Sequence, residues 1–149
     1  MIGLRRLFTM LESTFAPDKS PLLVSDNFLM GVVNNGTDPA IPNREGFFIL
    51  IKVRSTADIF DSLRAWEGKM FTDLRGFLGV PISADTNYLF TKDFEDGIVE
   101  NKNSRILYDK NGKVVIMYIF ADDNSVIITN SYNSAHEIML RLTSAKKEQ

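Results

Sequence analysis

One acidic residue, Glu67, stands where an apolar residue would be expected. In residues 55–78, which read STADIFDSLRAWEGKMFTDLRGFL, apolar residues recur at steps of three and four, which predicts an amphipathic helix. At about 100° per residue, Glu67 falls inside the apolar arc, between Leu63, Met70 and Leu74. A carboxylate on such a face has to be paired with a cation or neutralised.

Two kinds of chemistry would account for Glu67. It could act as a general acid or base, which makes a small hydrolase one reading of the chain. It could instead be a structural carboxylate that ties the helix to a sheet, and we expect this role. The possible partners are basic or hydroxyl side chains elsewhere in the chain, among which the sequence does not choose: Lys52, Arg54, Arg105 and Tyr118. The neighbouring Trp66 lies on the apolar stripe and is expected in the core.

Other reactive residues form weaker patterns. His136 is the only histidine and is followed by Glu137, but its place near the start of a helix favours an exposed surface residue. Two acidic clusters could offer oxygens to a hard cation, but neither has the spacing of a calcium loop, and we expect solvated turns: Asp93, Glu95 and Asp96, and Asp122, Asp123 and Asn124. We therefore predict no catalytic residue, no metal site and no cofactor.

Composition limits the function classes further. The 149 residues include 17 basic and 19 acidic side chains, so there is no basic excess that would indicate a nucleic-acid partner. The chain has no cysteine, which excludes disulfides, thiolate nucleophiles and thiolate metal ligands. It contains neither a P-loop nor a dinucleotide-binding glycine motif, and no apolar run long enough to span a membrane.

Apolar periodicity and turn residues predict a single α+β domain over residues 1–149 with the order α-β-β-α-β-β-β-α. The helices are expected over residues 2–15, 55–78 and 134–145, the last with a capping box formed by Ser134 and Glu137. Five strands are expected to form an antiparallel sheet, over residues 27–33, 47–53, 104–108, 113–120 and 125–129. Residues 88–90 and 97–100 are possible further strands. This order is like that of profilin-like and roadblock-type folds.

Several short segments together resemble the C-terminal domain of uncharacterised membrane-anchored proteins from uncultured bacterial lineages. The segments are NFLMG at 27–31, FFILIKV at 47–53, AWE at 65–67, NKNSRILYD at 101–109, and Gly112 followed by YIF at 118–120. The resemblance implies that Trp66, Glu67 and Arg105 belong to the family pattern. It also implies that the chain is the soluble part of a longer protein, located outside the cytoplasm; a cytoplasmic location is the alternative.

The sequence thus favours a non-enzymatic interaction or assembly domain that binds a protein partner or a second copy of itself. A small-ligand sensor of the profilin-like type is an alternative, and it would need a cavity between the long helix and the sheet. The hydrolase using Glu67 is the other alternative.

Overall fold

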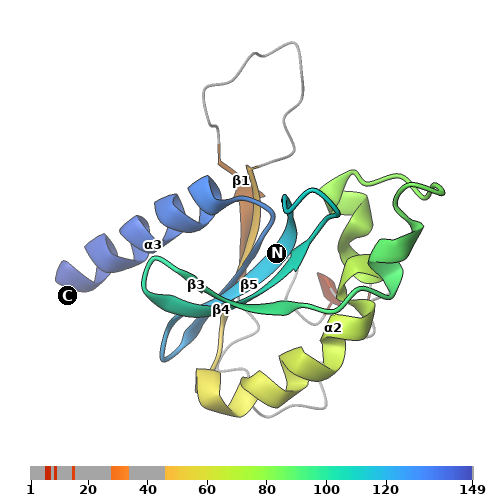
Figure 1. The fold of residues 1–149 in the computed structure, drawn as a ribbon. Helices are drawn as coiled ribbons and strands as arrows, with labels where there is room; N and C mark the ends of the chain where they lie inside the picture. Colours follow the sequence, from red (N-terminus) through yellow and green to blue (C-terminus); the bar gives the residue numbers. More distant parts are fainter. Residues whose placement is uncertain (1–5, 8, 10–14, 16–27, 34–45, 149) are drawn as a thin grey trace.

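The computed structural model describes residues 6, 7, 9, 15, 28–33 and 46–148. Their elements, labelled as in Figure 1, are six strands, two α-helices and one short 3-10 helix. In chain order they are β1 (Phe28–Val32), β2 (Phe47–Lys52), α2 (Thr56–Leu78), η3 (Asn87–Phe90), β3 (Glu95–Val99), β4 (Lys102–Tyr108), β5 (Val114–Asp122), β6 (Ser125–Thr129) and α3 (Tyr132–Lys147). The helix expected over residues 2–15 and the loop after Val33 lie almost entirely outside the described residues.

The strands form one antiparallel sheet in the order β1-β2-β6-β5-β4-β3. After β2 the chain runs through α2 to the far edge of the sheet, and the meander β3 to β6 returns to β2. The two α-helices lie on opposite faces of the sheet (Figure 1). The predicted α+β class and antiparallel pairing are confirmed, but the prediction of five strands is wrong because the sheet has six.

Helix α2 covers the more heavily buried face. Its apolar stripe packs on side chains that alternate along the central strands, such as Ile49 and Ile51 of β2 and Ile116 and Tyr118 of β5, and all four are fully buried. The helix ends where Gly79 adopts a left-handed conformation with φ 64°, which glycine tolerates without strain.

Helix α3 packs on the opposite face. Its residues Ala135 and Ile138 are buried against β5 and β6, including the fully buried Met117, Ile119 and Ile127. Because both faces of the central strands are covered, these strands are apolar almost throughout, as the sequence of β2 indicated.

The sixth strand, β3, was only partly anticipated. The sequence predicts a turn at its first residues, Glu95 and Asp96, and a possible strand only from residue 97, but Glu95 and Asp96 also pair with β4 in an antiparallel hairpin. An edge strand tolerates such residues because their side chains reach solvent. The hairpin turn uses Glu100 and Asn101, both with positive φ (50° and 60°), as tight two-residue turns require.

Two further expectations are corrected. Residues 88–90 form part of η3 rather than a strand; a short apolar run does not distinguish between these states. The last helix begins at Tyr132, two residues before the expected Ser134, because the side chain of Ser131 caps it by accepting a hydrogen bond from the Ser134 amide. The two α-helices, α2 and α3, follow β2 and β6. No helix among the described residues is long and apolar enough to cross a membrane.

Candidate functional site

The guanidinium of Arg105, on the α2 face of β4, donates four hydrogen bonds. Its side chain is only 9% exposed. Strand register places Asp96 of β3 on one side of it and Tyr118 of β5 on the other, so the three residues form one row across the sheet. A buried cation is stable only when its donors are bonded to acceptors, and in this row Asp96 supplies one of them.

Glu67 completes this arrangement from the helix. Its carboxylate accepts two hydrogen bonds from Arg105, at 2.9 Å from Nε and 3.1 Å from Nη2, and a third from the Tyr118 hydroxyl at 2.6 Å. Arg105 also donates to Asp96 at 2.7 Å and to the carbonyl of Phe94 at 2.8 Å. A two-pronged contact between arginine and carboxylate is among the stronger polar contacts in proteins. Of the four partners considered from the sequence, Arg105 and Tyr118 are therefore the two that Glu67 contacts.

Two members of the cluster, Arg105 and Tyr118, have raised pKa values. The hydrogen bond to Glu67 raises the pKa of Arg105 well above its ordinary value, although burial opposes this effect. Burial, and then the hydrogen bond to Glu67, raise the pKa of the Tyr118 phenol far above its ordinary value. The Glu67 side chain is 13% exposed, and both of its oxygens accept hydrogen bonds. This geometry suits the anchoring of α2 to β4 and β5.

Trp66 lies in the core next to this anchor. It is 3% exposed, its ring stacks on Phe15 with 4.8 Å between centroids, and its indole nitrogen donates to Asp73 at 2.6 Å. The structure therefore brings Glu67 and Arg105 into contact, while Trp66 makes its polar contact within α2.

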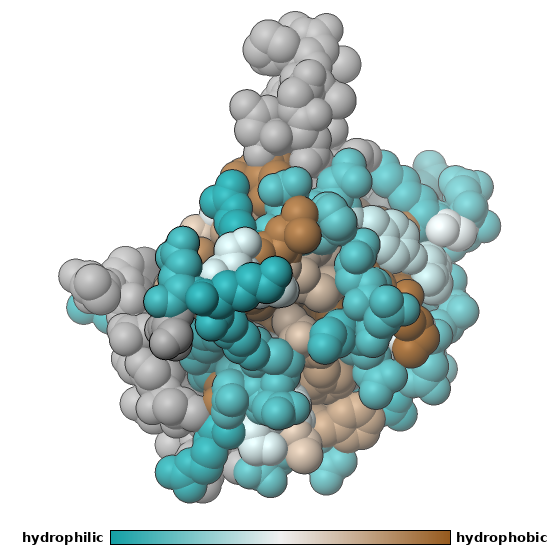
Figure 2. All heavy atoms as spheres, turned by 90° about the vertical axis from the view of Figure 1, so that its left-hand side faces the viewer, coloured by the Kyte–Doolittle hydropathy of each residue, from teal (hydrophilic) through white to brown (hydrophobic). Residues whose placement is uncertain are grey.

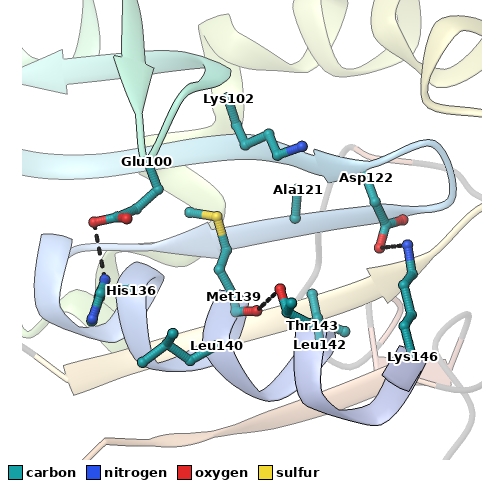
Figure 3. A pocket seen from close by; sticks show the side chains of 10 residues that line it. All are labelled: Glu100, Lys102, Ala121, Asp122, His136, Met139, Leu140, Leu142, Thr143 and Lys146. Atoms are coloured by element: carbon teal, nitrogen blue, oxygen red, sulfur yellow. Dashed lines mark hydrogen bonds and ion pairs between the residues drawn. The ribbon is translucent and has the colours of Figure 1, made fainter. Parts of the chain in front are cut away.

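Two other candidates from the sequence, His136 and Asp122, line a hollow between α3 and the sheet (Figure 3). Its volume is about 270 Å³. His136 Nδ1 lies 3.0 Å from a carboxylate oxygen of Glu100 at one end, and Lys146 Nζ lies 3.0 Å from Asp122 at the other. His136 is exposed, as expected. The two pairs join α3 to the β3–β4 turn and to the end of β5.

One carboxylate of each acidic cluster bonds to another part of the fold, Asp122 to Lys146 and Asp96 to Arg105. Burial alone would raise the pKa of Asp122, but hydrogen bonds from the Asn124 amide and from Lys146 lower it below its ordinary value. Asp96 of the other cluster is bonded to Arg105. Within the described part of the chain, no three histidine, aspartate or glutamate side chains are grouped to hold a metal ion.

Strand β1 carries a surface that was missed from the sequence. Leu29, Met30 and Val32 are 54%, 39% and 68% exposed, although they belong to an apolar run that reads as core. Figure 2 views the molecule from the α3 side, and part of its hydrophobic surface gathers toward the top, at the β1 end of the sheet. A hollow of about 760 Å³ adjoins this strand, bordered by Gly31, Val33 and Phe48 on the sheet and by Glu137, Ile138 and Arg141 on α3.

A third hollow, of about 450 Å³, lies at the C-terminal end of α2. Its apolar lining comes from α2, η3 and β5, through Leu78, Val80, Leu89, Val114 and Val115. Polar side chains of the β4–β5 hairpin and of the segment before η3 surround it: Asp85, Thr86, Asp109, Lys110 and Lys113.

The anchor can be tested by replacing Glu67 with glutamine. Glu67→Gln should lower the free energy of unfolding by about 1–3 kcal/mol, since it leaves the largely buried Arg105 without its principal charged partner. Asp61→Asn, at an exposed position of the same helix, is the control and should change stability by less than about 0.5 kcal/mol. Urea unfolding gives both values. If Glu67→Gln combined with Arg105→Met costs the sum of the single changes, the two side chains are not coupled.

Alkaline pH tests the environment of Tyr118. Its pKa in the folded chain lies above the ordinary value of about 10, so the stabilisation is complete below about pH 10 and is lost as pH rises toward the folded value. Stability should therefore fall above about pH 10, by up to about 1.4 kcal/mol per pH unit for this group. Tyr118→Phe should make this fall shallower. Some slope should remain, because the hydrogen bond to Tyr132 raises the pKa of Tyr108 to about 12. Equal slopes for the two proteins in urea unfolding would contradict the assignment.

Comparison of the chain with models of protein families, with curated proteins and with solved structures found no match.

Proposed function

We propose that the chain is a non-enzymatic interaction domain that binds an extended segment of a protein partner at the outer edge of β1. The observation that carries the proposal is the exposure of Leu29, Met30 and Val32 on β1, which is an edge strand of the sheet formed by the described residues. An edge strand offers backbone donors and acceptors to an added strand, and its exposed side chains supply apolar contacts.

The two edges of the sheet differ in a way that favours β1. Strand β3, at the opposite edge, carries Glu95 and Asp96 and exposes Ile98 as its large apolar side chain. Charged residues on an edge strand discourage the addition of another strand. Strand β1, with the sequence FLMGV, has no charged residue and is bordered by the hollow beside α3. A partner strand placed next to β1 would direct alternate side chains toward that hollow.

The environment of Glu67 supports a non-enzymatic role. A general acid or base must reach its substrate, whereas Glu67 is largely buried and accepts hydrogen bonds from Arg105 and Tyr118 through both of its oxygens. We therefore favour the structural role over the hydrolase alternative.

The wider setting of the domain is also part of the proposal. We keep the likeness to profilin-like and roadblock-type folds, which is supported by an antiparallel sheet between helices, with the sixth strand as an addition to that pattern. From the resemblance of the short segments, we propose that the chain is the soluble part of a longer membrane-anchored bacterial protein.

Peptide binding tests the proposed edge. Peptides selected from a random displayed library against the immobilised chain should include extended apolar sequences. Val32→Lys should weaken their binding by about tenfold or more, because it places a charge on the edge. Ile98→Lys is the matched control, since Ile98 is 67% exposed and Val32 68%, and it should leave the Kd unchanged. Fluorescence anisotropy gives both values. Failure to select such peptides with a monomeric chain, or equal binding to the two variants, would refute the proposal.

A small-ligand sensor remains the second candidate, favoured by the hollow at the end of α2. The middle of the interface between α2 and the sheet is filled by Met70, Ile116 and Tyr118, all fully buried, but the hollow of about 450 Å³ has an apolar lining and a polar rim, as ligand sites do. A thermal-shift screen of small amphipathic molecules tests it. A genuine ligand should raise the melting temperature of the native chain, and Val115→Phe, which fills the hollow, should abolish that rise. An unchanged rise in Val115→Phe would place the ligand elsewhere.

A further inference from the structure

The direction of the backbone groups along β1 determines which amide and carbonyl groups are available to an added strand. The amide of Val33 donates to the carbonyl of Gly46 at 2.7 Å, so Val33 faces β2. Backbone groups alternate in direction along a strand, and Gly31 and Leu29 therefore face β2 as well. Consistent with this, the Val53 amide donates to Asn124, on the side of β2 that faces β6. The amide and carbonyl groups of Phe28, Met30 and Val32 consequently point outward.

We propose that the segment bound at this edge is β1 of a second copy of the chain, paired antiparallel about a two-fold axis at Met30. This inference rests on the proposed function and names its partner. In this register Met30 lies opposite Met30 of the partner subunit, and Phe28 opposite Val32 of the partner subunit. All three outward-facing residues of each copy then form ladder hydrogen bonds. Moving the axis to Leu29 or Gly31 would leave one of them unpaired within β1.

Side-chain shape supports the same register. On the α3 face, Leu29 comes to lie opposite Gly31 of the partner subunit. Gly31 has no side chain, and a Cβ atom built on it would lie 3.1 Å from the ring of Phe48, so this ring fills the space next to the backbone. The protruding Leu29, which is 54% exposed, can therefore cover the glycine and the Phe48 ring of the other copy. On the α2 face, the pairing brings Phe28, Met30 and Val32 together.

Charge explains why a copy of the same chain fits at β1 rather than at β3. Pairing β1 with itself brings no charged residue into the new ladder. Pairing β3 with itself would gather Glu95 and Asp96 of both copies along one seam, and Asp96 is already bonded to Arg105. A two-fold interface is self-complementary by necessity, and like charges within it are unfavourable. The resulting dimer has one continuous sheet, with both α2 helices on the same face.

Proline at position 30 tests the pairing. Because the Met30 amide points outward, Met30→Pro removes a donor from the proposed interface and leaves the ladder between β1 and β2 intact. Light scattering after size exclusion should show the unaltered chain as a dimer at high concentration. Met30→Pro should weaken self-association by about tenfold or more. Its circular dichroism spectrum should be unchanged, and so should its melting temperature at a low concentration where both proteins are monomeric. Ile98→Lys, at the other edge, should still dimerise.

Cross-linking provides a test that does not depend on tolerance of proline. The chain contains no cysteine, so a single introduced one reports on one position. In the proposed register the Cα atoms of residue 30 in the two copies are about 5.5 Å apart, within disulfide range. Oxidised Met30→Cys should form a covalent dimer, and Ile98→Cys should not.

The outcomes separate this inference from the function on which it depends. An unaltered chain that stays monomeric while selected peptides bind at β1 would overturn self-pairing and leave the interaction domain standing. A monomer that also binds no peptide would overturn both. A dimer that withstands Met30→Pro, or that is cross-linked equally by Ile98→Cys, would place the interface elsewhere and overturn the pairing proposed here.

Discussion

The fold depends on how one largely buried cation is satisfied. Arg105 lies under α2, and its guanidinium bonds to Glu67 on the helix, to Asp96 on the next strand and to a backbone carbonyl. Removing any of these acceptors would leave a buried charge with fewer partners. Together with Tyr118, this contact fixes how α2 lies across β4 and β5. A residue that looks like a catalytic acid in the sequence is explained by this structural requirement.

The same cross-strand row connects the anchor to the proposed interaction surface. Strand register aligns Asp96, Arg105 and Tyr118 with Ile128 of β6, Ile49 of β2 and finally Met30 of β1. The residues of this row are charged at the β3 edge. They are fully buried in the centre of the sheet, and at β1 the row ends in an apolar side chain that is exposed. The two edges are therefore chemically different: one carries acidic side chains that discourage strand addition, and the other has apolar side chains that favour it.

The sequence was most informative where one local signal dominates. The apolar run of β2 and the periodicity of α2 each depend on neighbouring residues, and their structures were predicted closely. Pairing over long distances was not predictable, because Lys52, Arg54, Arg105 and Tyr118 were equally good partners for Glu67 until strand register was known. The acidic start of β3 was predicted to be a turn because charged residues are uncommon in buried strands. On an edge strand, charged side chains reach solvent and are tolerated. The exposure of β1 was missed because an apolar strand has the same sequence pattern at an interface as in a core.

Amide hydrogen exchange along β1, measured by NMR at low and high chain concentration, tests the central claim most directly. The amides of Leu29, Gly31 and Val33 face β2 and should be protected at both concentrations, because their hydrogen bonds lie within one copy. The amides of Phe28, Met30 and Val32 should exchange rapidly at low concentration and become protected at high concentration. If these three amides exchange equally fast at both concentrations, or if protection appears at β3 instead, β1 is not the edge through which the chain associates.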